Sequence, residues 1–389
     1  MRFVSADHEE AVQGDADRER LKRLFRVFTG AHGDGRSLVY EAVCGAIVND
    51  DLPDVLDLLL DAPEAQRRPS LLFAAINLLL QQRLDAELAG YYAIHGGGRA
   101  VDARLVPAVA KFCREHTDQL LPILRERSTQ TNEIRRSLAL RLGFDEVRRY
   151  WPGRLALVEV GASAGLNLRF DLYSYRANGI RASQAGRSAV VVTSEVRGGV
   201  GIDLLSGTPK ISSRLGIDQR PVDLSDPDAR LWLEAFIWPE QIDELTTLRG
   251  AIELATSRRV EVVAADATTE TAQILSTLPG REPVVVFTAS LLSYLSTADR
   301  AAFVSQLDAA AVHRPVAWVF AEAPGLLATT DLDIPALRGP LARRNSQYVV
   351  GASLRKPGKS DNDRLLALAD PYVRWLAPAR DETDDFAWA

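Results

Sequence analysis

The chain has few of the residues that build disulfide frameworks or metal centres. Its 389 residues include only two cysteines and five histidines. Cys44 and Cys113 lie far apart in the sequence, without CxxC spacing and inside apolar helical patterns. This pattern predicts two buried, reduced thiols. The histidines never fall at the spacing of metal ligands, so we expect no dedicated metal site.

An excess of positive charge is also missing, and so are long apolar runs. The formal net charge of −6 argues against a nucleic-acid or membrane-surface binder, because both kinds of partner favour a basic field. No apolar run reaches the length of a membrane span, and residues 1–20 are too polar and acidic for a signal peptide. We therefore expect a cytoplasmic protein, while no pattern in the sequence predicts its oligomeric state.

Helical spacing dominates the first part of the chain. The segment SLLFAAINLLL (Ser70–Leu80) is apolar nearly all round and predicts a central helix. The segment STQTNEIRRSLALRLG (Ser128–Gly143) predicts another helix, capped by one of its first hydroxyl side chains and ended by its glycine. We expect residues 1–150 to form an all-helical N-terminal cap or substrate domain.

Residues 151–389 alternate between strand and helix patterns. Strand-like apolar runs begin at Leu155, Leu215, Val260, Pro283 and Val316, and a terminal pair of strands is expected at Gln347–Leu354 and Leu365–Leu376. Continuous apolar runs separated by helices are typical of a parallel sheet that is covered on both faces. The sequence thus predicts an α/β fold with a Rossmann-like sheet of about seven strands. An insertion is expected at about 172–214, between the first helix and the second strand.

The stretch LALVEVGASAGLNL (Leu155–Leu168) leads from the first strand into a glycine turn. Small residues let the backbone turn sharply there and let a ligand come close. The spacing does not fit the dinucleotide fingerprint. Glu159-x-Gly161-x-Ser163-x-Gly165 instead resembles the acid-x-G-x-G-x-G pattern of class I S-adenosylmethionine-dependent methyltransferases, with serine as the middle residue. The resemblance implies that this loop and Asn167 cradle the amino-acid part of the cofactor, with the Glu159 carboxylate facing its ammonium group.

Acidic residues also end two later strands. A nucleoside ligand needs an acid at the end of the second strand to bind both ribose hydroxyls. We choose Asp218 in LGIDQRP for this role, and Glu195 in VVTSEV is the alternative. Asp266, at the end of VVAAD, is placed to take the adenine amino group, with Ala267 beside it. Acids at consecutive strand ends predict a nucleoside site at one edge of the sheet.

GASAG also matches the G-x-S-x-G nucleophile elbow, which would make Ser163 the nucleophile of an α/β-hydrolase. That fold reaches its elbow after several strands, whereas here the matching strand is the first. The histidine that must follow the serine could only be His313, which lies at a helix end. We therefore favour methyl transfer to a small-molecule acceptor. The alternatives are a non-catalytic or regulatory Rossmann-like nucleotide-binding protein and, less favoured, the serine hydrolase.

Polar residues before the first strand are candidates for binding the acceptor. Gln130, Asn132 and Glu133 are more polar than capping alone requires. We expect their helix to lie across the mouth of the cofactor cleft, with Asn132 and Glu133 facing the acceptor. Gln130 and Arg136 are assigned to substrate binding. Closing this side would exclude water and fix the acceptor in line with the transferred methyl group.

Three further residues are candidates on the opposite wall. Trp238 and Glu240, in WPEQ, would contact the acceptor, and Glu240 would act as general base. Tyr294, just past the fourth strand, is a candidate for contacting the substrate. The segment Arg169–Arg214 holds seven basic residues against three acids. It is either a solvated surface hairpin or a lid that attracts an anionic small molecule.

Six segments of the chain carry a further resemblance: RPSLLFAAINLLL, STQTNEIRRS, LVEVGASAGLNLRFD, RLGIDQRPVD, WPEQ and LLSYLS. They resemble the actinobacterial proteins grouped as domain of unknown function 2332 (DUF2332), over nearly the whole chain. The resemblance implies a Rossmann-like methyltransferase fold behind a helical N-terminal domain, and it does not imply a reaction. One departure is Asn77, near which relatives are expected to carry a histidine.

Overall fold

The computed structural model describes residues 6–32, 35–83, 86–183, 188, 190–197, 209–343, 347–356 and 359–378. The chain forms two compact units. The helical unit comprises Met1–Thr131 and Asp226–Thr246, and the sheet unit comprises Asn132–Ser225 and Thr247–Ala389. This division differs from the expected boundary at about residue 150. The last helix before the first strand belongs to the sheet unit, and the later segment Asp226–Thr246 belongs to the helical unit.

The helical unit is built around one central helix, as the sequence predicts. Its elements are α1 (Ala6–His32), α2 (Leu38–Val48), α3 (Pro53–Leu58), η1 (Leu59–Asp61), η2 (Glu64–Gln66), α4 (Pro69–Leu80), η3 (Glu87–Tyr91), η4 (Ala93–His95), α5 (Leu105–Glu115), α6 (Thr117–Glu126) and α8 (Pro227–Glu234). Every residue of α4 except Ser70 is buried. Pro53 and Pro69 each begin a helix, where the missing amide proton has no helical partner to lose.

Buried polar groups tie the later segment to the central helix. Asn77, which is fully buried, donates from Nδ2 to the carbonyl oxygens of Ala235 (2.9 Å) and Ile237 (3.1 Å). Its Oδ1 lies 2.6 Å from Nε2 of His95. Both cysteines are buried and free, which confirms the prediction made for them. None of the described helices is long and apolar enough to cross a bilayer.

The sheet unit contains a wider sheet than the predicted one of about seven strands. Among the described residues, eleven strands join in the order β3-β2-β4-β11-β10-β9-β8-β7-β1-β5-β6. The strands are β1 (Arg154–Val160), β2 (Ser174–Ala177), β3 (Ile180–Ser183), β4 (Val191–Val196), β5 (Lys210–Asp218), β6 (Val262–Ala264), β7 (Val284–Ala289), β8 (Val316–Glu322), β9 (Tyr348–Lys356), β10 (Lys359–Ala369) and β11 (Trp375–Pro378). The expected insertion supplies β2, β3 and β4, and the end of the chain supplies β11.

Five neighbouring strands, β6-β5-β1-β7-β8, form an all-parallel core. Within this core the strands follow one another from β1 outward to β5 and β6, and then on the other side of β1 with β7 and β8. The order of the strands therefore reverses beside β1. Beyond β8, β9 and β10 follow as an antiparallel pair.

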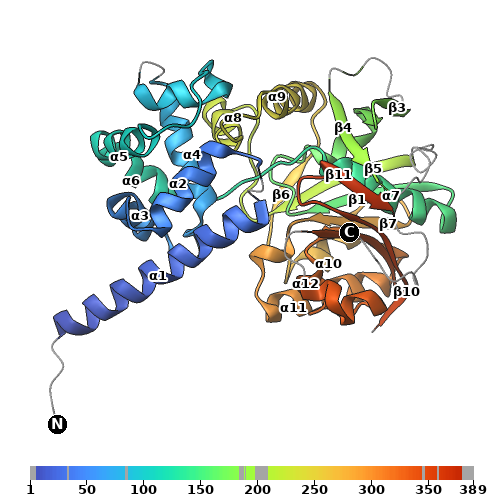
Figure 1. The fold of residues 1–389 in the computed structure, drawn as a ribbon. Helices are drawn as coiled ribbons and strands as arrows, with labels where there is room; N and C mark the ends of the chain where they lie inside the picture. The colour runs from blue at the N-terminus through green and yellow to red at the C-terminus, as the bar shows by residue number, and fades with distance from the viewer. Residues whose placement is uncertain are drawn as a thin grey trace, which may run out of the picture. The chain divides into compact units, whose positions relative to one another are not determined.

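Helices cover both faces of this core (Figure 1). The helices of the sheet unit are α7 (Arg136–Tyr150), α9 (Ile242–Ser257, which begins in the helical unit), α10 (Thr271–Thr277), α11 (Thr297–Ala311) and α12 (Pro324–Leu327). Its short 3-10 turns are η5 (Asn167–Leu172), η7 (Leu292–Tyr294), η8 (Pro335–Arg338) and η9 (Pro340–Arg343). On the α7 face, Phe144 packs edge-on against Phe287, with ring centroids 5.2 Å apart. On the opposite face, Phe303 of α11 packs against Trp318 at 5.7 Å.

Two sequence-based predictions of elements are wrong. The helix expected from Ser128 begins at Arg136 instead, and its N-cap residue makes no side-chain hydrogen bond. The strand expected over Leu365–Leu376 is the end of β10 and the start of β11, separated by a turn in which Val373 has φ 53°.

Candidate functional site

The carboxyl ends of β1 and β7 mark the point at which the strand order reverses. Open parallel sheets bind their ligands at such a point, because the connections diverge there and leave a crevice. The loops that follow the two strands are in contact. A Cβ atom on Gly161 would lie 3.1 Å from Cδ1 of Leu291. We therefore take these two loops as the centre of the candidate site.

The loop after β1 has an unusual backbone. Gly161, Ser163 and Gly165 have φ values of 76°, 50° and 64°. Ser290, directly after β7, also has a positive φ of 69°. Positive φ is uncommon for residues other than glycine and tends to occur at functional sites. Two serines in this conformation, at the ends of two adjacent strands, favour a functional role for this edge of the sheet.

Backbone amides of the glycine loop are used inside the protein. Four of them have internal acceptors: Gly161 and Ala162 donate to the Ile217 carbonyl, Ser163 to Oδ2 of Asp218 at 2.8 Å, and Gly165 to the Ala162 carbonyl. Arg169, which is 2% exposed, adds a bond from its Nη1 to the Gly165 carbonyl at 2.6 Å. The loop is thus held rigidly and does not direct these amides at a phosphate group.

Glu159 lies beneath this loop and is only 3% exposed. Burial raises the pKa of its carboxyl group to about 8, and the nearby Asp218 adds to the rise, while hydrogen bonds from Asn167 and the Leu168 amide oppose it. Within the described residues, Oε2 of Glu159 and Oδ1 of Asn167 are buried without a hydrogen-bond partner. The charge of Arg169 also opposes the rise, and with a pKa of about 8 Glu159 is still mainly protonated at neutral pH.

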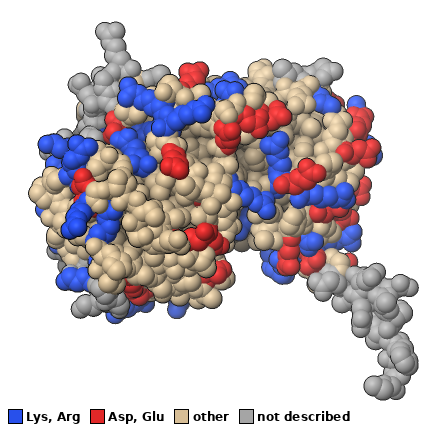
Figure 2. Space-filling model, turned by 180° about the vertical axis from the view of Figure 1, so that it is seen from behind, with Lys and Arg blue, Asp and Glu red and all other residues tan. Residues whose placement is uncertain are grey.

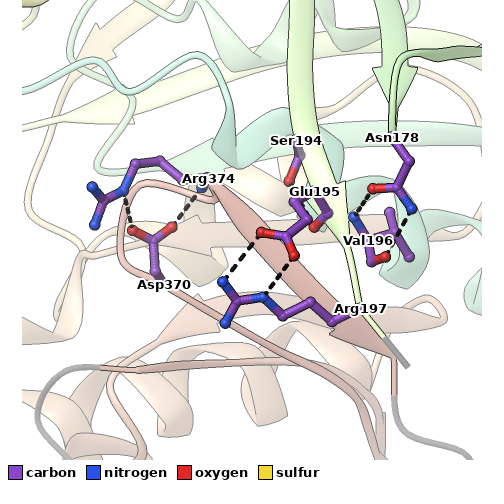
Figure 3. A network of polar contacts seen from close by, with 7 residues as sticks. All are labelled: Asn178, Ser194, Glu195, Val196, Arg197, Asp370 and Arg374. Atoms are coloured by element: carbon purple, nitrogen blue, oxygen red, sulfur yellow. Dashed lines mark hydrogen bonds and ion pairs between the residues drawn. The ribbon is translucent and has the colours of Figure 1, made fainter. Parts of the chain in front are cut away.

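Asp218 ends the strand that pairs with β1. Besides the Ser163 amide, its carboxylate accepts the amide of Arg220, at Oδ1 and 2.8 Å. The alternative acid, Glu195, is on β4, which the sheet order separates from β1 by five strands, β11 to β7. Its carboxylate pairs with Arg197 at 3.1 Å, beside the ion pair of Asp370 and Arg374 (Figure 3). The topology therefore favours Asp218 as the acid next to the glycine loop.

Asp266 follows β6 and occupies a turn of its own. Its Oδ1 accepts the Thr268 amide at 2.7 Å, and its Oδ2 accepts Nε2 of Gln219 at 2.9 Å. The hydrogen bond from the Thr268 side chain is the main cause that lowers the pKa of Asp266. Ala267 is buried beside it. Asp266 is thus ionised and half-buried at the same edge of the sheet as Asp218.

The segment from Asn132 to Arg136 crosses this edge. It is not the helix that we expected but the irregular chain and first turn before α7. Asn132 donates from Nδ2 to Oγ of Ser163 at 2.8 Å, next to β1. Arg136 donates from Nη1 to the carbonyl of Ala289, at the end of β7, at 3.3 Å. The segment therefore reaches the carboxyl ends of both strands that flank the reversal.

Arg136 is the centre of a polar cluster at the end of β7. It is 7% exposed, and its Nε donates to the Pro371 carbonyl at 3.1 Å. Its guanidinium lies 5.7 Å from the centroid of the Tyr348 ring. The hydroxyl of Tyr348 lies 2.6 Å from Oγ of Ser290. Sequence analysis identified Arg136 and missed Ser290 and Tyr348, which lie in no motif.

Glu322 is a second buried acid that sequence analysis missed. It ends β8, is fully buried, and accepts the amides of Leu291 at 2.9 Å and Leu292 at 3.2 Å. Burial raises the pKa of its carboxyl group to about 7. The sequence contains the same signal that identified Glu159 and Asp218, since the acid directly follows an apolar strand in VAWVFAE. Glu322 fixes the turn that carries Tyr294.

The remaining predicted site residues, Gln130, Trp238 and Glu240, belong to the helical unit. Glu240 accepts the amide of Val39 with Oε1 at 3.1 Å, in the first turn of α2. Trp238 is 6% exposed and stacks on Phe28, with ring centroids 5.2 Å apart. These contacts stabilise the helical unit. The place of Trp238 and Glu240 opposite Asn132 stays a prediction.

Several basic residues of the expected lid have internal partners. Arg214 pairs with Asp171 at 2.7 Å, and Arg169 donates from Nε to the Arg258 carbonyl at 3.0 Å. Arg187 and the side chain of Arg181 lie outside the described residues. Basic and acidic side chains both occur across the face that Figure 2 shows. The partnered arginines support the interpretation as a surface segment more than the lid.

The serine-hydrolase interpretation needs a histidine next to Ser163. His313 is the only histidine in the residue ranges of the sheet unit. It is exposed and precedes β8, so it lies at the amino end of a parallel strand, whereas Ser163 follows the carboxyl end of β1. Opposite edges of the sheet do not bring a base to its nucleophile. For metals, no group of three or more suitable side chains occurs among the described residues.

The fold and the site define a mixed α/β protein whose parallel core reverses its strand order beside a glycine loop. A family model described as an uncharacterized protein conserved in bacteria (DUF2332) matches residues 22–377. The chain therefore belongs to this family, as the resemblance of its six segments indicated. A comparison with curated proteins found no match.

Proposed function

We propose that the sheet unit binds an S-adenosylmethionine-type cofactor at the carboxyl ends of β1, β5 and β6, and that the protein transfers a methyl group to a small-molecule acceptor. The observation that carries the proposal is the link between Asp218 and the glycine loop. The carboxylate at the end of β5 accepts the Ser163 amide at 2.8 Å. An acid that is fixed beside a glycine turn at the strand reversal is suited to binding a ribose there.

The residues at this edge are compatible with such a cofactor. Each oxygen of Asp218 accepts one backbone amide and has a further lone pair, so the carboxylate can also accept two ribose hydroxyls. Asp266 and Ala267 would hold the adenine. The buried acceptors of Glu159 and Asn167 without partners are suited to a cationic amino group, because a buried acceptor without a donor is costly. When bound, the cofactor supplies a methyl group on a positively charged sulfur.

The glycine loop also favours a ligand without phosphates. In dinucleotide and P-loop sites, backbone amides point at the phosphate oxygens. Here the amides of Gly161, Ala162, Ser163 and Gly165 donate within the protein. This arrangement supports a nucleoside with an amino-acid tail over NAD or ATP.

The chain's own residues would act mainly by positioning. Asn132 holds Ser163 through its side-chain amide, and so fixes the segment that faces the acceptor. Glu133, half-buried on the same segment, would take the proton that an oxygen or nitrogen acceptor loses. Alignment of an acceptor in a site closed to water can supply much of the rate enhancement, without a covalent intermediate.

Binding of S-adenosylhomocysteine to Asp218 variants tests the proposal. Asp218→Asn keeps the size of the side chain but removes the charge that binds ribose hydroxyls. It should weaken binding by about 1–3 kcal/mol in isothermal titration calorimetry. Asp223→Asn is the matched control, because Asp223 holds Ser225 in a similar turn on the same loop. The proposal fails if the wild type does not bind, or if both variants bind with wild-type affinity.

A further inference from the structure

The cluster around Arg136 holds a buried guanidinium whose hydrogen bonds go only to neutral groups. Arg136 begins α7, a helix of 15 residues with no acidic residue in its first turn, so the helix dipole adds a partial positive charge at the same place. The two groups that accept hydrogen bonds from its guanidinium, the carbonyls of Ala289 and Pro371, are neutral. Among the described residues, Nη2 has no hydrogen-bond partner and the guanidinium has no ion-pair partner.

Two acids lie near enough to favour the charged form of Arg136, but neither forms an ion pair with it among the described residues. Glu133 accepts the Arg135 amide with Oε1, and Glu322 accepts the two backbone amides after β7. An anionic ligand could therefore still form a direct ion pair with this guanidinium. The guanidinium is therefore held in a fixed orientation by neutral acceptors, with one nitrogen left to donate.

The ring of Tyr348 lies beside this guanidinium, 5.7 Å from it. The pKa of Arg136 is lowered by burial, but the nearby Tyr348, Glu133, Tyr372 and Tyr294 outweigh that effect and raise it. Tyr348 is 8% exposed, whereas Tyr294 is 43% exposed. Of these two tyrosines, Tyr294 is thus the one open to solvent. Aromatic rings beside a cation offer an apolar surface to the body of a small ligand.

We propose that Arg136, with Tyr348 beside it and Tyr294 nearby, binds the carboxylate group of a small organic acid, and that this acid is the acceptor class of the enzyme. The assignment of the acid as the acceptor rests on the proposed function, whereas the carboxylate site itself does not. A planar guanidinium binds a planar carboxylate through two parallel hydrogen bonds. A phosphate carries more charge and is usually held by several cations or amides, and Arg136 is the one buried cation described in this cluster.

The test uses benzoate, its neutral analogue benzamide, and inorganic phosphate as probes of the full chain. Binding is followed by saturation-transfer NMR and isothermal titration, first without any cofactor. Benzoate should bind wild type, and benzamide and phosphate should bind at least roughly tenfold more weakly, as expected when a charge-assisted bidentate contact is lost. Arg136→Lys should weaken benzoate binding by a similar factor, because lysine lacks the planar fork.

A matched control is available on the same helix. Arg141 is 2% exposed and lies over the Tyr175 ring at 4.7 Å, so Arg141→Lys makes the same chemical change at a buried arginine outside the cluster. It should leave benzoate binding unchanged. If Arg136→Lys does not fold, Tyr294→Ala, at a partly exposed position, should still weaken benzoate binding severalfold. Equal binding of benzoate and benzamide overturns the carboxylate subsite, and so does tighter binding of phosphate.

The same titrations separate this inference from the proposed function. Benzoate binding that depends on Arg136, in a protein that does not bind S-adenosylhomocysteine, retains the carboxylate subsite and refutes the methyltransferase. Binding of S-adenosylhomocysteine that depends on Asp218, in a protein that does not distinguish benzoate from benzamide, retains the methyltransferase and refutes the subsite.

Discussion

Replacement of Glu159 by glutamine should change the pH dependence of stability. Burial raises the pKa of this carboxyl group from an ordinary 4.5 to about 8. Between these two values the folded protein holds a proton that the unfolded chain releases. The free energy of unfolding must therefore fall as pH rises through this window, by about 1.4 kcal/mol per pH unit for one proton. Above the window it levels off. Glu322, whose pKa burial raises to about 7, adds a second proton over the lower part of the window.

The glutamine variant keeps one donor and one acceptor, as the protonated acid does, so its contacts with Asn167 and Leu168 can persist. It removes one of the two titrating groups. Between about pH 5 and 7, Glu159→Gln should lose roughly half of the wild-type slope. Near pH 8 it should be more stable than wild type by more than about 2 kcal/mol, because it avoids burying an ionised carboxylate.

Urea unfolding at several pH values measures this effect. Pulsed hydrogen exchange of the peptide that contains β1 reports the sheet unit alone, so the helical unit does not obscure the transition. Glu195→Gln is the control, because Glu195 is exposed and paired with Arg197, and it should keep the wild-type slope. The reasoning is refuted if Glu159→Gln also keeps that slope, or if it is less stable than wild type at high pH.

Two further substitutions test the packing of the site. Asn132→Ala removes the hydrogen bond to Ser163, which should lower the free energy of unfolding by about 1 kcal/mol or less and speed hydrogen exchange in the glycine loop. The control Asn178→Ala removes two hydrogen bonds to Val196 and should leave exchange in that loop unchanged. Equal exchange of the loop in both variants would contradict the role given to Asn132. Gly143→Ala adds a methyl group that clashes with the Val319 side chain, so the melting temperature should drop by the equivalent of about 1–3 kcal/mol; an unchanged melting temperature would show that α7 does not pack on β8 as described.

The sequence predicts the parts of the fold that apolar periodicity determines. The central helix α4 and the core strands β1, β7 and β8 are apolar runs of clear length, and the structure confirms them. The start of α7 could not be predicted in the same way. Several polar residues in STQTNE can each cap a helix, and no apolar period chooses among them. The short strands β2 and β3 were missed because each has only four residues.

The candidate site divides along similar lines. Glu159 and Asp218 were predictable because an acid at the end of an apolar strand is a local signal, and their strands proved to be neighbours. The cluster around Arg136 depends on contacts between distant segments. Tyr348 comes from β9 and Pro371 from the turn after β10, and the sequence contains no sign that an antiparallel pair returns to this edge.

A titration of the wild-type chain with S-adenosylhomocysteine, with NAD and ATP as competitors, tests whether the sheet unit binds this type of cofactor. We expect one-to-one binding that neither nucleotide displaces, together with slower hydrogen exchange in the Gly161–Gly165 loop. No binding of S-adenosylhomocysteine, in a folded protein that binds NAD or ATP, would refute the proposed methyltransferase.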